Sequence, residues 1–185
     1  MKRISSQLAV LGLVAVLGLA TAGSVEAENV ALARNGAVAV ASSTGFGDTD
    51  VASVDKIIDD VRSGIDAYWT DDTVDDFPDV VQINFFGTKT IDRVVVFSVQ
   101  EELRNFGGID PTDTDNCLVY VLVDFTVEGW NGSNWVTLGT VTDNDLCKRT
   151  VTFAPFRTDQ IRIDITAVGG FSLSRIAEVE AWEAE

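Results

Sequence analysis

The sequence has no histidine, only two cysteines, three prolines and one methionine in 185 residues. Without histidine it cannot form a Ser-His-Asp triad or a histidine-ligated zinc site. It also lacks a Gly-x-Ser-x-Gly nucleophile elbow and a phosphate-binding loop. Paired carboxylates could serve a glycosidase. However, 29 acidic residues make close pairs unavoidable, so their abundance indicates nothing. The sequence therefore predicts a protein that is not an enzyme.

Basic residues are scarce as well, with 13 Lys and Arg against 29 Asp and Glu and a net charge of −16. Nucleic-acid backbones and anionic lipid headgroups both require clustered positive charge. We therefore expect no nucleic-acid partner and no binding to membrane lipid. A surface this acidic is typical of a soluble extracellular protein and attracts cations.

Long apolar runs are absent except near the N-terminus, where Leu8–Ala20 follows the basic head Met1-Lys2-Arg3. The run is shorter than the ~20 residues that a membrane span requires, which disfavours the alternative of a membrane anchor. Val25-Glu26-Ala27 fits a signal-peptidase site. We expect residues 1–27 to be a cleaved signal peptide and residues 28–185 to form a single secreted domain, extracellular or periplasmic.

The two cysteines, Cys117 and Cys147, fit this expectation of export. An even pair in an exported chain is most simply a disulfide. The alternative is a metal-binding pair, which has no histidine partners in this sequence. A disulfide here would stabilise the fold by roughly 2–4 kcal/mol.

Short alternating segments separated by turn residues make up most of the remaining sequence. In Asp124–Val141 two such runs flank Asn131-Gly132-Ser133-Asn134, which predicts a β-hairpin. Long loops are expected over 43–79 and 100–116, and no stretch of helical length repeats every three to four residues. About eight short strands predict an all-β, antiparallel β-sandwich of the jelly-roll type. Besides the hairpin, the predicted strands are 37–42, 80–86, 91–99, 118–123, 150–153, 160–166 and 176–182.

The order of several short motifs resembles the discoidin, or coagulation-factor type C, domain. The motifs are Asn29–Leu32, Ala41–Ser43, Val54-Asp55, Trp69, Val81–Phe85, Thr90–Val94, the hairpin with Trp130, Gly132 and Trp135, Ile161–Ile163 and Ala177–Trp182. The resemblance covers essentially all of residues 28–185. It implies a galactose-binding-like jelly roll, related to family 32 carbohydrate-binding modules, usually with one structural calcium.

The function that this resemblance implies is a secreted, lectin-like module that binds extracellular or cell-surface glycan without catalysis. The alternative is a protein–protein adhesion or surface-layer component on the same fold that does not bind sugar. The missing histidine favours this alternative, because sugar sites in the family often use histidine and arginine.

The resemblance also implies a set of calcium ligands. Calcium takes about six to eight oxygen ligands from carboxylates and backbone carbonyls. Glu178 gains independent support because it alternates with Glu180 and Trp182, opposite Ala177, Val179 and Ala181, so one of two neighbouring acids is available for an ion. The implied ligands are the carbonyls of Ala52 and Ala177 and the side chains of Asp55, Glu178 and either Asp71 or Asp72.

The sequence departs from the family at Lys56–Asp60, where the family usually has a tight turn that contains glycine. Asp59 or Asp60 could replace the middle calcium ligand there. The alternative is that all these acids only form a solvated surface.

A sugar site needs an aromatic ring for the CH face of the sugar and fixed polar groups for its hydroxyls. The resemblance implies such a site in loops at one end of the sandwich, with Arg104 and either Phe106 or Phe171 at its centre. The alternative is that both phenylalanines fill the core and that Arg104 pairs with an acid. The candidate residues are Gln100, Glu102, Arg104, Asn105, Phe106 and Phe171, whereas Trp69, Trp130, Trp135 and Trp182 are expected to pack on strands.

Overall fold

The computed structural model describes residues 27–45, 52–64, 67–100 and 109–185. In these ranges seven antiparallel strands form the sheet structure, with two short 3-10 helices, which confirms the predicted all-β class. No helix in the same ranges has the length and apolar character of a membrane span. The elements are η1 (Ala33–Asn35), β1 (Val38–Ala41), η3 (Val54–Ile58), β2 (Trp69–Thr70), β3 (Asp79–Ser98), β4 (Leu122–Trp130), β5 (Trp135–Val141), β6 (Lys148–Val168) and β7 (Arg175–Glu183).

The predicted hairpin is confirmed as β4 and β5, which pair from Phe125–Val141 to Trp130–Trp135. The side-chain oxygen of Asn131 accepts hydrogen bonds from the backbone N–H groups of Ser133 (3.0 Å) and Asn134 (2.9 Å). Gly132 takes φ +96°, a conformation that residues with a side chain rarely adopt. The turn is therefore specified by its own four residues.

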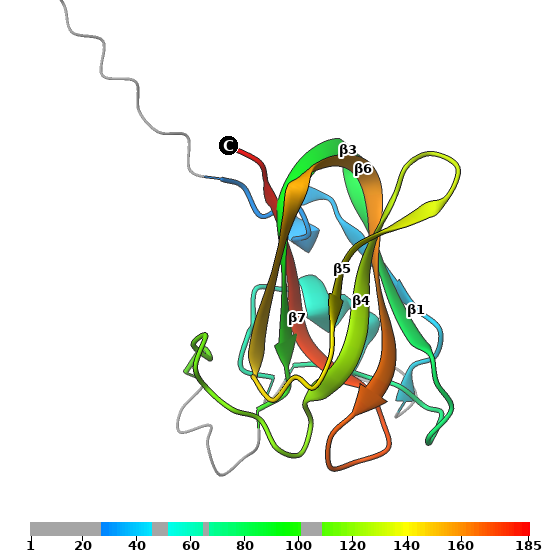
Figure 1. The fold of residues 1–185 in the computed structure, drawn as a ribbon, viewed down its shortest axis with the longest axis vertical. Coiled ribbons are helices and arrows are strands. Elements are labelled where there is room, and N and C mark those ends of the chain that lie inside the picture. Colours follow the sequence, from blue (N-terminus) through cyan, green and yellow to red (C-terminus); the bar gives the residue numbers. More distant parts are fainter. Residues whose placement is uncertain (1–26, 46–51, 65–66, 101–108) are drawn as a thin grey trace, which may run out of the picture.

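Two strands are longer than the sequence predicted. The segments 80–86 and 91–99 belong to one continuous strand, β3, and 150–153 and 160–166 belong to another, β6. Both strands bend instead of ending, and the β3–β6 register shifts between Asn84 and Lys89. Gly87, at φ +76° with open space around it, permits the bend in β3. Figure 1 shows β3 and β6 bending together at the same end of the molecule.

The bends divide the sheet into two layers. The first half of β3 pairs with β1 and with the second half of β6, which continues to β4 and β5. The second half of β3 pairs with β7 and with the first half of β6, and β7 continues to β2. The predicted strand 118–123 begins only at Leu122, and the predicted loop 43–79 contains η3 and β2.

The hydrophobic core lies between these two layers, as the alternation of side chains along the strands predicts. Trp69 of β2 is completely buried, and η3 adds Ile57 and Ile58. Other core residues are Val81, Ile83, Ile91, Val94, Val96, Phe125, Val127, Ile161, Ile163, Ile165, Ile176, Val179 and Ala181.

The other three tryptophans are half-buried and pack on strands outside this core. Trp130 and Trp135 pack edge to face with their ring centroids 5.4 Å apart, and the Arg93 guanidinium lies 5.0 Å from the Trp182 ring.

The first and last described segments lie side by side. Glu183 donates a backbone hydrogen bond to the Glu28 carbonyl at 3.0 Å, and Asn29 forms a bridge with Trp182. In Figure 1 the C-terminus lies at the end where β3 and β6 bend, and the β6–β7 loop lies at the opposite end. We refer to this opposite end as the loop end.

Candidate functional site

The predicted sugar-site residues lie only partly in the described part of the chain. Phe171, in the β6–β7 loop, has 53% of its surface exposed. Gln100 is buried, and its side-chain amide donates a hydrogen bond to the Ile109 carbonyl at 3.3 Å, so it supports the local backbone. Glu102, Arg104, Asn105 and Phe106 lie outside the described residues, and their role remains a prediction.

The structure gathers three further residues around Phe171. The Phe171 and Tyr120 rings stack with centroids 5.4 Å apart and planes 17° from parallel. The Arg175 guanidinium lies 4.3 Å from the centre of the Tyr120 ring and 5.8 Å from that of Phe171. It also lies 5.9 Å from the Tyr68 ring. We call Tyr68, Tyr120, Phe171 and Arg175 the aromatic–arginine cluster.

Three parts of the chain that are far apart in the sequence bring this cluster together. Arg175 is the first residue of β7 and pairs with Thr70 of β2. Tyr68 immediately precedes β2, and Tyr120 lies two residues before β4. Tyr68 and Tyr120 both pack on a small apolar cluster formed by Val95, Phe97, Val99 and Ala177. Sequence reasoning missed Tyr68, Tyr120 and Arg175. The one local signal was that Arg175 directly follows the loop 169–174, which was predicted to contribute Phe171 to the sugar site.

The chemistry of the cluster suits a polyhydroxylated ligand. One face of Phe171 lies against Tyr120, while half of its surface remains exposed and free to receive an apolar face of a ligand. The Nε of Arg175 is buried and has no hydrogen-bond partner in the described part of the chain. Arg175 as a whole is only half-buried, and its guanidinium has further N–H donors, so the cluster offers an aromatic platform beside a charged donor group.

The predicted disulfide is confirmed, since Cys117 and Cys147 are bonded to each other. Backbone hydrogen bonds from Cys117 to Asp145 (2.9 Å) and from Cys147 to Asp115 (2.8 Å) flank it. The bond therefore joins the segment that precedes β4 to the β5–β6 loop. Because Tyr120 follows Cys117 by three residues, the disulfide also restrains one ring of the aromatic–arginine cluster.

Glu178 occupies a second site, on the face of β7 that also carries Glu180, where the backbone of Asp60 lies against it. Its side chain has no exposed surface, and its Oε1 has no hydrogen-bond partner among the described residues. Its Oε2 accepts one hydrogen bond, from the backbone N–H of Asp60 at 3.2 Å. Burial above all, and then the charge on Asp59, raises the pKa of Glu178 to about 10.

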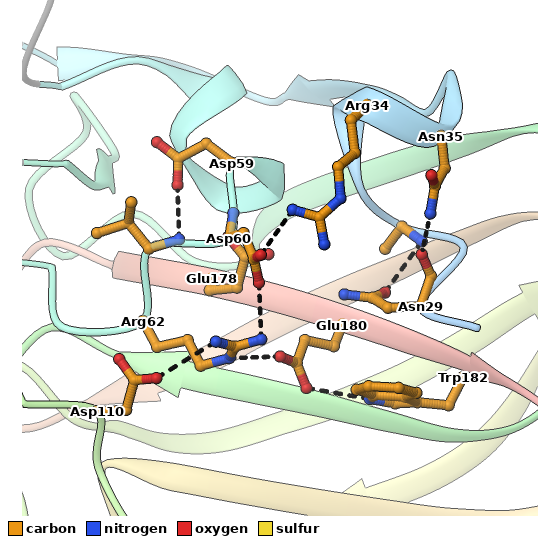
Figure 2. A network of polar contacts seen from close by, with 12 residues as sticks. Asn29, Arg34, Asn35, Asp59, Asp60, Arg62, Asp110, Glu178, Glu180 and Trp182 are labelled. Carbon is orange, nitrogen blue, oxygen red and sulfur yellow. Dashed lines mark hydrogen bonds and ion pairs between the residues drawn. The ribbon is translucent and has the colours of Figure 1, made fainter. Parts of the chain in front are cut away.

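Glu180, its neighbour on β7, is fully paired, as Figure 2 shows. Arg62 donates from Nε to Glu180 at 2.6 Å and from Nη2 to Asp60 at 2.7 Å. The Trp182 indole N–H donates to the other Glu180 oxygen at 3.0 Å. Of the two neighbouring glutamates, Glu178 is thus the one whose charge has no bound partner in the described structure, which fits the predicted ion ligand.

The other predicted calcium ligands differ in burial and in their contacts. Ala52 is buried and bridged to Tyr68, while Asp55 in η3 and Asp72 are exposed. The Asp71 N–H donates to the Ser174 carbonyl, four residues from Glu178 on β7 and so about 13 Å along the strand. Ala177 does not share a face with Val179 and Ala181, because the β3–β7 register shifts at Phe97–Ser98.

Asp59 and Asp60, the residues predicted as possible replacements for the middle calcium ligand, form a turn beside Glu178. Asp60 adopts φ +74°, the left-handed conformation usually taken by glycine, and its N–H contacts Glu178. No group of three or more acidic or cysteine side chains gathers in metal-binding geometry anywhere in the described ranges. A cation at Glu178 would therefore take most of its ligands from backbone carbonyls and water.

Asp71 instead lies beside Asp79, and both carboxyl groups are buried. The Thr73 hydroxyl lies 2.8 Å from one oxygen of Asp71 and 3.4 Å from one oxygen of Asp79. The Ser174 hydroxyl donates to the other oxygen of Asp79 at 2.7 Å. Burial raises the pKa of Asp79 to about 6, and the charge on Asp71 contributes to the rise.

Comparison with known proteins places this fold. No protein-family model matches the sequence, and no curated protein is significantly similar to it. Among solved structures, a family 32 carbohydrate-binding module from Clostridium perfringens, in complex with GalNAc-β-1,3-galactose, superposes with a TM-score of 0.62. The match covers 83% of this chain and 99% of that one, at 11% identity. The chain has the fold of the family 32 carbohydrate-binding modules.

Two further carbohydrate-binding modules superpose on this chain about equally well. The family 32 module of C. perfringens NanJ, in complex with galactose, gives a TM-score of 0.58 at 18% identity, covering 85% of this chain and 98% of that one. A chitosan-binding module of a chitosanase/glucanase from Paenibacillus sp. IK-5 gives 0.60 at 21% identity, covering 83% and 98%. The predicted galactose-binding-like sandwich is thereby confirmed.

Proposed function

We propose that this chain is an exported, non-catalytic module that binds extracellular glycan through the aromatic–arginine cluster at its loop end. The observation that carries the proposal is the exposed Phe171 ring, stacked on Tyr120 and placed next to the Arg175 guanidinium. The fold is one whose solved examples include complexes with galactose and with GalNAc-β-1,3-galactose. The disulfide fits an extracellular location.

The physical basis of the proposal is the two-sided character of a sugar ring. Its CH groups form an apolar face that packs on an aromatic ring, and its hydroxyls need directed hydrogen-bond donors and acceptors. Phe171 supplies the exposed ring, and Arg175 supplies donors in a fixed plane. A rigid platform loses little conformational entropy when a ligand binds.

Replacing Phe171 with alanine should weaken glycan binding about tenfold, which corresponds to about 1.4 kcal/mol. The exposed half of the ring would no longer cover the sugar, whereas the fold should persist because Phe171 lies outside the core clusters. The measurement is a glycan array followed by calorimetry with galactose, N-acetylgalactosamine and chitotriose.

Phe86 provides a matched control for this variant. It is also an exposed phenylalanine, at 76%, and it lies beside the β3 bend at the other end of the molecule. Phe86→Ala should leave glycan affinity unchanged. If both variants bind like the wild type, the site assignment fails. If the wild type binds no glycan with or without calcium, the adhesion or surface-layer hypothesis becomes the better one.

We propose in addition that a structural calcium binds at Glu178. The unpartnered Oε1 of Glu178 is the observation that supports it, since a buried carboxylate oxygen is costly to leave unsatisfied. The Glu178 side chain, the Ala177 and Ala52 carbonyls and either Asp59 or Asp60 would hold the ion. Calcium would give Glu178 a directly bound positive charge, as Arg62 does for Glu180.

A further inference from the structure

Asp71 and Asp79 form a buried carboxyl pair that the proposed functions do not use. Asp71 follows β2 and is 0% exposed, and Asp79 opens β3 and is 2% exposed. The Thr73 hydroxyl lies between the two carboxyl groups, at 2.8 Å from Asp71 and 3.4 Å from Asp79. A hydroxyl has one hydrogen, so it cannot donate to both groups at once.

The hydrogen bonds around this pair are distributed unevenly. Three donors converge on Oδ1 of Asp71, from the Ser43 hydroxyl and from the N–H and hydroxyl of Thr73. The other oxygen, Oδ2, is buried and has no partner among the described groups. Burying a carboxylate oxygen without a partner is unfavourable because the lost hydration is not replaced. An unpartnered oxygen at this position therefore points to a bound group that the chain itself does not supply.

The local charge favours a cation as that group. Residues 70–79 include Asp71, Asp72, Asp75, Asp76 and Asp79 and contain no lysine or arginine. None of the five aspartates forms an ion pair with another described residue. Two ionised carboxylates in contact in a buried place repel each other strongly unless a positive charge joins them.

Asp79, but not Asp71, also lines a cavity that is open to solvent. A cavity of about 250 Å³ lies directly beside Asp79. Asp76 lies on its wall, and the hydroxyl groups of Ser42, Ser43 and Thr73 add neutral oxygens. Hard divalent cations prefer carboxylate, hydroxyl and water oxygens. The cavity therefore provides both an entry path and room for bound water.

We propose that Asp71 and Asp79 bind a divalent cation of the calcium type, at a site separate from Glu178. Oδ2 of Asp71 and the carboxylate of Asp79 are its charged ligands, and the Thr73 hydroxyl and water complete the coordination. The ion ties the segment after β2 to the start of β3. Because Ser174 is bonded to Asp79 and precedes Arg175, the ion also fixes the start of β7 beside the aromatic–arginine cluster.

The test counts bound calcium by equilibrium dialysis at pH 7.5 in the wild type and in Asp79→Asn. The same substitution is also made in a Glu178→Gln background, so that the two sites are read separately. In each background Asp79→Asn should lower the bound calcium by one ion per chain. Asp72→Asn is the matched control, because Asp72 is exposed and its carboxylate makes no described contact with the pair. It should change nothing.

The proposal is overturned if Asp79→Asn binds as much calcium as its parent in both backgrounds. That result would mean that the two carboxyls share a proton. Folding is checked separately by thermal melting in chelator. There Asp79→Asn should melt no lower than the wild type, because the amide removes one of two repelling groups. If Asp79→Asn binds one ion fewer but also melts lower in chelator, the lost ion could reflect damage to the fold. Asp71→Asn is then tested in its place, and it must lose one ion for the proposal to stand.

Discussion

In an Asp79→Asn background, which lacks the second proposed site, calcium added to the chelator-treated protein should raise its melting temperature by about 10 °C, and Glu178→Gln should remove most of this rise. A ligand present at about 1,000 times its Kd stabilises the folded state by about 4 kcal/mol, and a chain of this size shifts by about 2–4 °C per kcal/mol. Glutamine preserves the shape of Glu178 but cannot carry the charge that holds the ion. Thermal melting with and without calcium is the measurement.

The same calcium binding should release a proton and strengthen with pH. The pKa of Glu178 is raised to about 10 in the metal-free fold, so its carboxyl is protonated at neutral pH and must lose that proton to bind calcium. Apparent affinity should rise about tenfold per pH unit below pH 10. Without calcium the pH dependence has the opposite sign, and the free energy of unfolding should fall as pH rises from about 4.5 toward 10. In that range Glu178 has lost its proton in the unfolded chain but still holds it in the folded one.

Glu180→Gln is the control for Glu178→Gln, because Glu180 is neutralised by Arg62 and should not govern calcium binding. Its loss would leave Arg62 paired with Asp60 and Asp110. Equal calcium-induced shifts in the wild type and in Glu178→Gln would refute the proposed site. Calorimetry in two buffers with different ionisation enthalpies would detect the released proton, and identical heats in both would exclude it.

Removing the disulfide with Cys117→Ser and Cys147→Ser together should lower the free energy of unfolding by about 2–4 kcal/mol. The bond connects positions 30 residues apart and restricts the unfolded chain. Both cysteines are buried, so serine also places polar groups where no water reaches. Chemical denaturation of the double variant against the wild type measures the difference.

The disulfide variant should also bind glycan more weakly, because Tyr120 lies three residues after Cys117 and stacks on Phe171. Wild-type protein in strong reductant provides the control, and it should show the loss of stability that comes from the missing bond alone, without the added cost of buried serine hydroxyls. An unchanged unfolding midpoint in the double variant would mean that the flanking hydrogen bonds of Cys117 and Cys147 fix these loops without the covalent bond.

The parts of the fold that were predictable from sequence are those encoded locally. Asn131 and Gly132 specify their turn through side-chain hydrogen bonds and a positive φ within four residues. By contrast, the sequence around Gly87 indicated an end of a strand, because glycine and threonine interrupt the apolar alternation. Only pairing with β6 on the other side of the bend shows that β3 continues.

The candidate sites were less predictable because their residues meet only in three dimensions. Phe171 was identified from its own loop, but Tyr68, Tyr120 and Arg175 come from other elements, and each has an ordinary local context. The departure at Lys56–Asp60 was visible in the sequence. Its outcome, with Asp60 adopting a conformation typical of glycine, depends on the contact between its N–H and Glu178.

The hydrogen bond between Glu183 and the Glu28 carbonyl has a practical consequence for presentation. Because the two ends of residues 28–185 leave the molecule together, a tether attached to either one holds the module by the same point. In Figure 1 the β6–β7 loop faces away from that point. A bead, a sensor chip or a fused protein attached at either terminus would therefore leave Phe171 accessible, and several copies could engage a dense glycan surface at the same time.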